Sequence, residues 1–373
     1  MTALSVRAGD PVSAIDTPAL VIDLAAMQRN LARMAGFAAQ HRQRLRPHAK
    51  THKSATIAAL QIAAGAVGVC VQKVGEAEAL ADGGVGDIFI SNELVAESKL
   101  ARVAALAGRI KLAIAVDSPL GVDRLTHALK TAGTMVDVFV EIDVGHGRCG
   151  VAAAAAGALA HQVVSHGLRF AGLQAYNGRA QHLRDPAERE AAVRHAASLA
   201  RAAQASITAA GIHCPLVTGA GTGSFVFETA SGVYGELQAG SYVFMDRDYA
   251  DNHAAPHAPA FEHALFVKSQ VMSRGTSHAV IDAGHKAHAI DSGLPRVWGR
   301  DLVFSNGGDE HGILQAHGGS TSALPGLSDT VWLVPGHCDP TVNLHDHYVV
   351  VRGGLENGTV DAVWPIDARG KLT

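Results

Sequence analysis

A basic stretch early in the chain combines side chains that can do chemistry with a position that favours it. It reads LRPHAKTHK over residues 45–53 and precedes an alanine-rich segment that predicts a helix from about Ser54. Apolar runs alternate with helical segments on both sides, which predicts that Lys50 lies at the C-terminal end of a buried parallel strand. Barrel enzymes carry their catalytic residues at that end of the strands.

This position allows two interpretations of Lys50. Partial burial and the nearby positive charges of His48, His52 and Lys53 would both favour the neutral amine. A neutral lysine amine is a nucleophile toward carbonyl groups, so the first interpretation is Schiff-base chemistry. The second is a lysine that binds a phosphate or a carboxylate at the end of a strand, and the stretch alone favours neither.

Eight apolar runs separated by alanine-rich segments predict a closed parallel sheet. The runs cover residues 45–50, 67–73, 87–91, 111–117, 136–143, 168–175, 215–219 and 236–244. Most of the segments between them end near a glycine, as helices commonly do. Strict alternation of strand and helix implies a parallel sheet, and eight such units close a TIM (β/α)8 barrel.

A second domain of a different kind is predicted beyond the barrel. After about residue 255 the helical spacing disappears, and short β-rich runs separated by Gly, Asp and Pro take over. We therefore expect an α/β barrel at residues 25–254 and a C-terminal, mostly antiparallel β domain at residues 255–373. The strand-like run at residues 19–23 has no place in the barrel, so residues 1–24 are assigned to the β domain.

The composition of the chain limits its partners and its compartment. Its 373 residues are 48% hydrophobic and carry a formal charge of -3, which indicates neither a nucleic acid nor a membrane surface as partner. No apolar run has the length of a membrane span, and the N-terminus lacks the apolar core of a signal peptide, so we expect a cytoplasmic protein. The four cysteines form no CxxC pair, which predicts free thiols, with Cys70 in the core of a strand.

Further polar residues follow the later strands. Arg148 lies in DVGHGRCG after the fifth predicted strand, Tyr176 lies in QAYNG after the sixth, and TGAGTGS occupies residues 218–224 after the seventh. A glycine-rich turn after a late barrel strand exposes backbone N–H groups that suit a phosphate. Gly240 and Ser241, predicted within the eighth strand, add further donors. A Schiff-base lysine opposite a phosphate cradle describes pyridoxal phosphate.

These motifs give the chain a resemblance to a known family. RPHAKTHK, QKVGEAE, DVGHGRCG, TGAGTGS, ELQAGSY and the late HCDPTVNLHD together resemble the fold-type III pyridoxal-phosphate enzymes, which have an alanine racemase-like barrel. Within that group the chain resembles the D-threonine aldolases and their relatives in the D-serine dehydratase-like family, the D-serine and 3-hydroxyaspartate dehydratases. The resemblance covers nearly the whole chain and implies a homodimer with the active site near the interface.

The resemblance also implies roles for individual residues. Lys50 matches the lysine that forms the Schiff base with the cofactor, Arg148 the arginine facing its phenolic oxygen, and Tyr176 the tyrosine beside its ring. The positions that match contacts of the cofactor phosphate are Thr222, Gly240 and Ser241. Gln238 lies where the racemases place an arginine opposite the pyridine nitrogen. A neutral amide there leaves the ring a weaker electron sink, so another source of activation is needed.

A metal ion bound by the motif GHCDPT is the source that the resemblance implies. In an extended segment His337 and Asp339 point to the same side and can share one ion, while Cys338 faces away. The dehydratase relatives carry His-x-Cys here, which suits zinc, whereas imidazole with a carboxylate suits manganese first, with magnesium or cobalt as alternatives. The alternative without a metal is that Asp339 caps a turn before Pro340.

The activity implied is reversible retro-aldol cleavage of D-threonine and related D-β-hydroxy-α-amino acids to glycine and an aldehyde. His182 matches a histidine that faces the substrate hydroxyl and would act as general base, with a metal-bound hydroxide as the alternative base. Some relatives have a tyrosine at the next position, where this chain has Leu183, so a contact from residue 183 is not carried over.

Two other functions stay open. The first is β-elimination by a metal-dependent dehydratase of the D-serine or 3-hydroxyaspartate type, in which Lys50 takes the α-proton. The carboxylate ligand Asp339 favours the aldolase over this alternative. The second is a non-catalytic pyridoxal-phosphate-binding protein of cofactor homeostasis. Residues 255–373 argue against it, because such proteins have a single domain.

Overall fold

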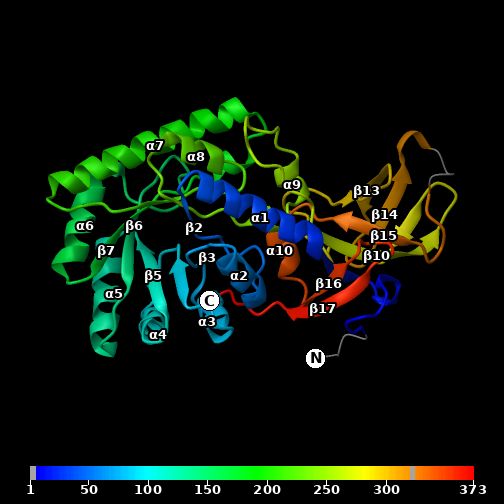
Figure 1. Ribbon diagram of the computed structural model, residues 1–373, viewed down its shortest axis with the longest axis horizontal. Coiled ribbons are helices and arrows are strands. Elements are labelled where there is room, and N and C mark those ends of the chain that lie inside the picture. The colour runs from blue at the N-terminus through cyan, green and yellow to red at the C-terminus, as the bar shows by residue number, and fades with distance from the viewer. Residues whose placement is uncertain (1–5, 320–323) are drawn as a thin grey trace.

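Eight parallel strands form a barrel in one part of the molecule, on the left of Figure 1. The computed structural model describes residues 6–319 and 324–373. The strands are β2 (Arg44–Leu45), β3 (Val69–Val71), β4 (Asp87–Ile90), β5 (Lys111–Val116), β6 (Asp137–Glu141), β7 (Arg169–Gln174), β8 (Val217–Gly219) and β9 (Glu236–Leu237). They lie in the order β2-β9-β8-β7-β6-β5-β4-β3, and a parallel bridge between His48 and Cys70 joins the two ends of that order. The predicted (β/α)8 barrel is therefore confirmed.

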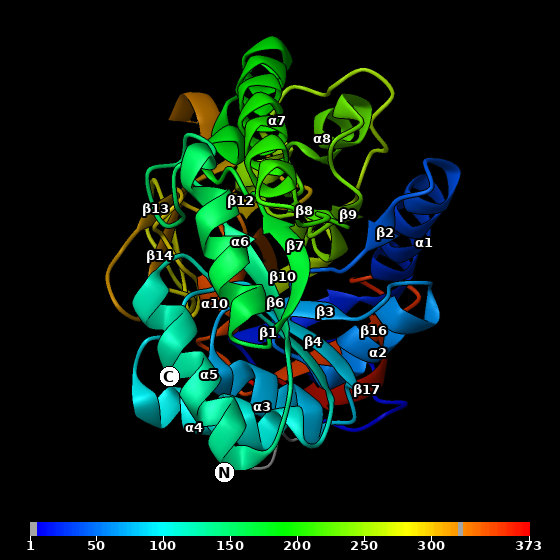
Figure 2. The ribbon, with the colours of Figure 1, turned by 90° about the vertical axis from the view of Figure 1, so that its left-hand side faces the viewer.

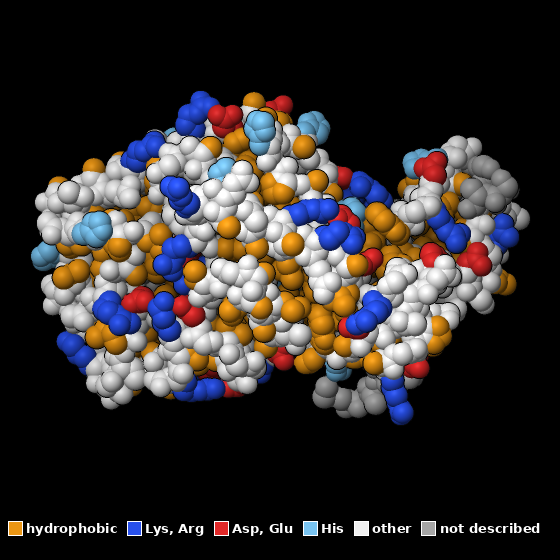
Figure 3. Space-filling model, in the orientation of Figure 1, with side chains coloured by type: hydrophobic (Ala, Val, Ile, Leu, Met, Phe, Trp, Pro, Cys, Tyr) orange, Lys and Arg blue, Asp and Glu red, His pale blue; other side chains and the backbone are white. Residues whose placement is uncertain are grey.

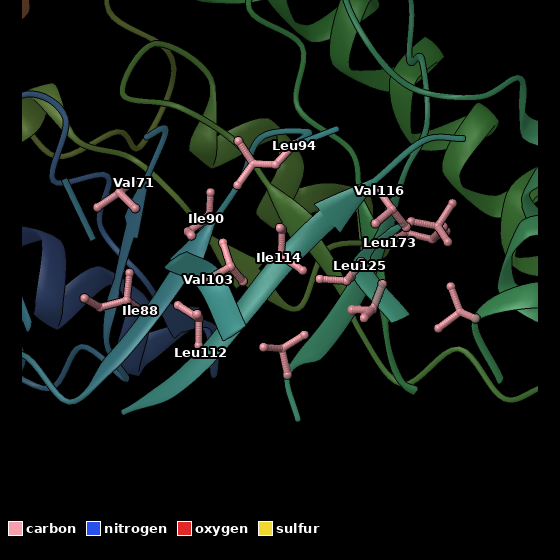
Figure 4. Packing of buried hydrophobic residues seen from close by; sticks show 14 of the residues in the cluster. Val71, Ile88, Ile90, Leu94, Val103, Leu112, Ile114, Val116, Leu125 and Leu173 are labelled. Carbon is pink, nitrogen blue, oxygen red and sulfur yellow. The ribbon is translucent and has the colours of Figure 1, made fainter. Parts of the chain in front are cut away.

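Helices cover the outside of this barrel, and Figure 2 shows several of them in front of the strands. They are α1 (Leu24–Gln40), α2 (Ala55–Ala63), α3 (Val74–Asp82), α4 (Glu97–Ala107), α5 (Pro119–Ala132), α6 (Ala156–Ser165), α7 (Pro186–Ala209) and α8 (Phe225–Ser231). Between strands and helices lies a core of buried aliphatic side chains, in which Ile88 of β4 and Ile114 of β5 pack with Val103 of α4 and Leu125 of α5 (Figure 4). The burial of this apolar surface is the main force that holds the helices on the barrel.

The last predicted barrel strand differs from the structure. Residues 236–244 were expected to form one strand, but β9 ends at Leu237 and the 3-10 turn η4 (Ser241–Val243) follows. The chain turns here because the N–H of Tyr242 bonds to Thr222 Oγ1 and the N–H of Met245 bonds to the oxygen of Ser241, rather than to a neighbouring strand. Gly240 and Ser241 therefore lie beyond the strand, and not within it.

The second part of the molecule is a β-rich domain, on the right of Figure 1. Its strands are β1 (Ala19–Asp23), β10 (Leu265–Arg274), β11 (Ala279–Ile281), β12 (Arg296–Val297), β13 (Leu302–Asn306), β14 (Gly312–Ala316), β15 (Thr330–Val334), β16 (His347–Arg352) and β17 (Thr359–Pro365). All pairings are antiparallel except that of β1 with β16, so the C-terminal antiparallel sheet is confirmed. β1 lies between β10 and β16. The domain boundaries at residues 24/25 and 254/255 stay a prediction.

Other expectations concern the cysteines and the surface. All four cysteines are free thiols, as predicted, and Cys70 is fully buried in β3. Acidic and basic side chains are interspersed over the face seen in Figure 3. None of the helices that the structure describes combines the length and the apolar character that crossing a bilayer requires.

Asn30 of α1 connects the barrel to the segment that leads into the β-rich domain. Its side chain is fully buried. Its Nδ2 donates to the oxygens of Glu262, at 2.7 Å, and Val243, at 3.3 Å, and its Oδ1 accepts from the N–H of Glu262 at 2.8 Å. One side chain thereby satisfies buried backbone groups that no regular element pairs.

We expect Asn30→Ala to lower the free energy of unfolding by roughly 2–3 kcal/mol, because it removes three hydrogen bonds and leaves buried backbone groups unpaired. The measurement is urea denaturation followed by circular dichroism. Gln28→Ala, on the exposed face of the same helix, is the control and should change stability by less than about 0.5 kcal/mol. Equal effects of the two substitutions would contradict this role of Asn30.

Candidate active site

A cavity of about 570 Å³ opens at the carboxyl ends of the barrel strands. Eight of the ten predicted site residues line it, namely Lys50, Arg148, Tyr176, His182, Thr222, Gln238, Gly240 and Ser241. The other two, His337 and Asp339, come from the β-rich domain and reach the cavity through an ion pair between Asp339 and Lys50. The structure thus brings together all ten residues, whose functional roles stay predictions.

The ion pair sets the charge of Lys50. Its side chain is 40% exposed, and the exposed part faces the cavity. Burial opposes the ammonium charge, but the adjacent Asp339 carboxylate outweighs it, so the pKa of Lys50 is raised above its ordinary value. The expectation of a neutral amine is therefore wrong for the protein without a bound cofactor.

His48, His52 and Lys53 do not lower the pKa of Lys50 in the way that the sequence suggested. His48 and His52 are buried, and burial lowers the pKa of His48 well below its usual range and that of His52 to about 4. Lys53 is also buried and lies 2.5 Å from Glu76 Oε1 in a salt bridge. Two neutral imidazoles and a paired lysine leave Asp339 as the dominant electrostatic neighbour of Lys50.

Arg148 and Tyr176 face each other at one side of the cavity. The guanidinium carbon of Arg148 lies 5.5 Å from the centre of the Tyr176 ring, a cation–π distance. Behind Arg148, the buried Glu141 places Oε1 at 3.7 Å from its NH2 group. Glu141 was not predicted from the sequence, although an acid at the end of an apolar strand is a signal that could have identified it.

Two loops form a cradle on the opposite side. Tyr242 N–H donates to Thr222 Oγ1 at 3.0 Å, which joins the loop after β8 to the loop after β9. At Gly240 a Cβ atom would lie 2.7 Å from the backbone oxygen of His48, so only glycine fits there. Gly221 and Gly240 line the cavity without side chains, which gives an anionic group such as a phosphate access to the backbone there.

A series of side-chain hydrogen bonds holds the loop after β8 that contributes to this cradle. Gln181 Oε1 accepts from Gly223 N–H at 3.0 Å, and its Nε2 donates to Ser224 Oγ at 2.6 Å. Ser224 donates in turn to Glu228 Oε1 at 2.7 Å. Glu228 is fully buried with no donor for its Oε2 among the described residues, and burial raises its pKa to about 7 although Ser224 opposes the shift.

Gln238 is held in one orientation. Its Nε2 donates to Gln174 Oε1 at 2.7 Å and to Thr218 Oγ1 at 2.8 Å. Both N–H bonds of the amide are thus used inside the protein. The amide therefore offers no positive charge to the cavity, and its expected place opposite the nitrogen of a cofactor ring stays a prediction.

His337 and Asp339 form a pair that fits a divalent metal ion. His337 Nε2 lies 4.0 Å from Asp339 Oδ1, and that oxygen is buried with no hydrogen-bond partner among the described residues. The Nδ1 of His337 lies 2.7 Å from Asp291 Oδ2, which leaves Nε2 free toward an ion, as in carboxylate–histidine–metal arrangements. Asp291 was missed because it lies 46 residues from His337.

The local geometry of this motif differs from the extended segment that was expected. His337 is extended and caps the short helix α10 (Cys338–Val342), so Asp339 lies in the first helical turn. Cys338 is fully buried, packs in the apolar core and does not line the cavity, and its N–H donates to Asp246 Oδ2 at 2.9 Å. Helix geometry, and not strand alternation, brings the two candidate ligands to the same side.

His182 lies in the 3-10 turn η3 (Arg179–His182) and is about half exposed to the cavity. Its Nδ1 lies 2.6 Å from Asp248 Oδ2, and Asp248 also pairs with Arg184. Burial opposes ionisation, but the hydrogen bonds from His182 and Arg184 lower the pKa of Asp248 to about 2. Asp248 lies in the short helix α9 (Arg247–Ala250), and no sequence pattern connects it with a histidine 66 residues away.

Known proteins resemble the chain over its full length. The profile of the alanine racemase N-terminal domain matches residues 22–248, and that of a putative serine dehydratase domain matches residues 264–351. The chain is 45% identical over 366 residues to a D-threonine aldolase from Arthrobacter sp., which covers 97% of this chain and 95% of that protein. It is 42% identical over 369 residues to a 3-hydroxy-D-aspartate aldolase from Paracoccus denitrificans, which covers 96% and 93%.

A solved structure gives the same result. The crystal structure of D-threonine aldolase from Filomicrobium marinum matches with a TM-score of 0.96 at 46% identity, and the match covers 100% of both chains. The barrel, the β-rich domain and their relative placement are therefore shared with an enzyme of known activity.

The raised pKa of Glu228 predicts a pH-dependent effect on stability. An ordinary glutamate has a pKa of about 4.3, so the folded chain loses stability as the pH rises from that value to about 7. Glutamine keeps the acceptor for Ser224 and carries no charge. The stability advantage of Glu228→Gln should therefore grow by roughly 2–3 kcal/mol between about pH 5 and pH 8 in urea titrations.

The control for this prediction is Glu356→Gln, because Glu356 is exposed. This substitution should show no such growth with pH. A constant difference between Glu228→Gln and the natural chain at all pH values would contradict the assignment of a buried, mostly neutral Glu228.

Proposed function

Because the chain belongs to the alanine racemase-like family, as an aldehyde-lyase of the D-threonine aldolase type, we propose that it cleaves D-threonine and related D-β-hydroxy-α-amino acids to glycine and an aldehyde. Pyridoxal phosphate and a divalent metal ion are the cofactors of this proposal. The observation that supports it is the ion pair between Asp339 and Lys50, a residue that lines the cavity, because the proposed Schiff-base lysine then lies next to the proposed metal ligands.

Pyridoxal phosphate fits the residues around the cavity. Lys50 would hold its carbonyl carbon, Arg148 and Tyr176 would flank its ring, and the cradle with Thr222 and Gly240 would take its phosphate together with Ser241. When bound, the cofactor supplies an electron sink for the breaking of a bond to Cα. The fixed, neutral amide of Gln238 would leave that sink weak, so the proposed reaction calls for a second activating group.

A divalent ion fits His337 and Asp339. An imidazole with a carboxylate favours manganese, with magnesium or cobalt as alternatives, and the bound ion would lower the pKa of a hydroxyl group nearby. Asp291 would orient the His337 ring through Nδ1. By holding the ion, His337 and Asp339 would then determine where the β-hydroxyl of the substrate lies in the cavity.

His182 is the proposed general base. Asp248 binds the Nδ1 side of the ring, so Nε2 is the acceptor that the ring presents. After the imidazole takes the proton of the β-hydroxyl, the Asp248 carboxylate stabilises its positive charge, as the acid of a histidine–aspartate pair does in other enzymes. Arg184 fixes Asp248 in turn through an ion pair.

Elimination by a dehydratase is the alternative, and the match of residues 264–351 to a putative serine dehydratase domain favours it. It would use the same cavity, with Lys50 taking the α-proton. Assembly as a homodimer is proposed on the family resemblance alone, and the cytoplasmic location expected from the sequence stays a prediction.

The first test follows the products formed from D-threonine. After the metal is stripped, turnover should fall at least about 100-fold and return with Mn²⁺, with acetaldehyde and glycine as products. Asp339→Asn should remain inactive with Mn²⁺, whereas Asp346→Asn, an exposed residue of the same segment that pairs with Arg369, should behave like the natural chain. 2-Oxobutanoate and ammonia as the main products would rule out the aldolase.

A second test separates Asp248 from His182. His182→Ala should lower kcat by roughly 10²–10⁴-fold, and Asp248→Asn should lower it less, with little change in KM. If Asp248 acts through His182, the double variant should be no slower than His182→Ala. The control is Asp251→Asn, which changes an acid that pairs with Arg247. Additive losses in the double variant would show that Asp248 acts independently.

A further inference from the structure

Three metal-ligating side chains converge on the ends of successive barrel strands, outside the site described above. Glu93 follows β4, Asp117 follows β5 and Cys149 follows β6. One ligand atom from each lies within 4.8 Å of the ligand atoms of the other two. Figure 4 shows Leu94 and Val116, the sequence neighbours of the two acids, near the same end of the adjacent strands. Neighbouring parallel strands thereby bring residues far apart in sequence to one point.

A fourth acid lies against this cluster, and one of its two carboxylate oxygens has no hydrogen-bond donor among the described residues. Glu141, the last residue of β6, is 3% exposed, and its carboxyl group is within hydrogen-bonding distance of Glu93. Its Oε2 and both carboxylate oxygens of Glu93 are buried, and within the part of the chain that the structure describes the only donor near them is the Cys149 thiol beside Glu93. Buried carboxylates are paired, protonated or bound to a metal ion, because an isolated buried charge is very costly.

The nearby positive charge does not satisfy these oxygens. Arg148 approaches Glu141 at Oε1, at 3.7 Å, and its side chain is 42% exposed, while its guanidinium group lies over the Tyr176 ring. Asp117 receives one backbone hydrogen bond, from Gly150 at 3.2 Å. Three carboxyl groups and a thiol thus share one small volume with little compensation from the protein.

We propose that Glu93, Asp117 and Cys149 bind a divalent cation, with Glu141 hydrogen-bonded to Glu93 behind them. Two carboxylate oxygens and a thiolate form a mixed hard and soft set that suits zinc, which is usually four-coordinate in such sites. Zinc lies about 2.0–2.3 Å from oxygen and sulfur ligands, so the cluster would contract slightly around the ion. The thiol of Cys149 gives up its proton when it binds.

The position of the cluster indicates what this ion would do. Cys149 directly follows Arg148 in the chain, so an ion on its sulfur fixes the loop that carries the arginine into the cavity. Glu93 directly follows Asn92, which also lines the cavity. None of the three ligands lines the cavity itself, so the ion is a structural one that positions Arg148, distinct from the ion proposed at His337 and Asp339.

Cobalt is the probe for this site, because a thiolate bound to Co²⁺ absorbs strongly in the near ultraviolet. The starting protein is the metal-stripped holoenzyme carrying His337→Ala and Asp339→Ala, which lacks the other proposed site. It should bind one equivalent of Co²⁺ with a thiolate absorption band, whereas the natural chain should bind two equivalents. Neither readout requires an active enzyme, so the result is independent of the proposed aldolase activity.

Three single variants in this background identify the ligands. Cys149→Ser should remove the thiolate band, and Glu93→Gln should weaken cobalt binding at least tenfold while the thiol remains. Cys214→Ser, at a half-buried thiol of another strand connection, should leave the band unchanged. Circular dichroism of each variant verifies that the chain is folded before the titration is interpreted.

Two results would overturn the proposal. One is the absence of cobalt binding to the double variant, which would mean that protons shared among Glu93, Glu141 and Cys149 satisfy the cluster. The other is a thiolate band that persists in Cys149→Ser, which would assign the absorbing thiol to another cysteine.

Discussion

The contact between Lys50 and Asp339 joins two folds that the chain builds from distant segments. Lys50 follows the first barrel strand, and Asp339 stands in a helical turn of the β-rich domain, 289 residues later. The carboxylate is 12% exposed, and a buried charge left without its partner is costly. The cavity therefore acquires its full set of functional groups only when barrel and β-rich domain dock in one arrangement.

The four-residue helix α9 and the residue before it contact both the Asp339 segment and His182. Asp246, which precedes it, accepts the N–H of Cys338 and thereby fixes the turn that presents Asp339. Asp248, within it, holds the ring of His182 and donates its own N–H to the oxygen of Gly336. The candidate metal ligands and the candidate base are thus positioned by one short element, and a shift of that element would displace both together.

The sequence predicted the parts of the structure that depend on local pattern. Alternating apolar and helical segments indicated the barrel, and Lys50, Arg148 and Tyr176 were placed at strand ends by that alternation alone. The motif resemblance added His337 and Asp339. The residues that were not predicted from the sequence depend on contacts across the fold. Asp248 binds His182 and Asp291 binds His337, in each case from a distant segment. The charge of Lys50 was misjudged because adjacency in sequence does not reveal whether a histidine is buried and neutral.

The place of β1 has a consequence for the order in which the chain can fold during synthesis. This strand leaves the ribosome before any barrel strand, but its partners β10 and β16 are made only after all barrel strands. Every barrel strand lies between β1 and β10 in sequence. The barrel can therefore form before the strands that pair with β1 have been synthesised. The residue that pairs with Lys50 also arrives late. A nascent chain therefore has Lys50 long before it has the carboxylate of Asp339, and the ion pair between them can form only after the β-rich domain has been made.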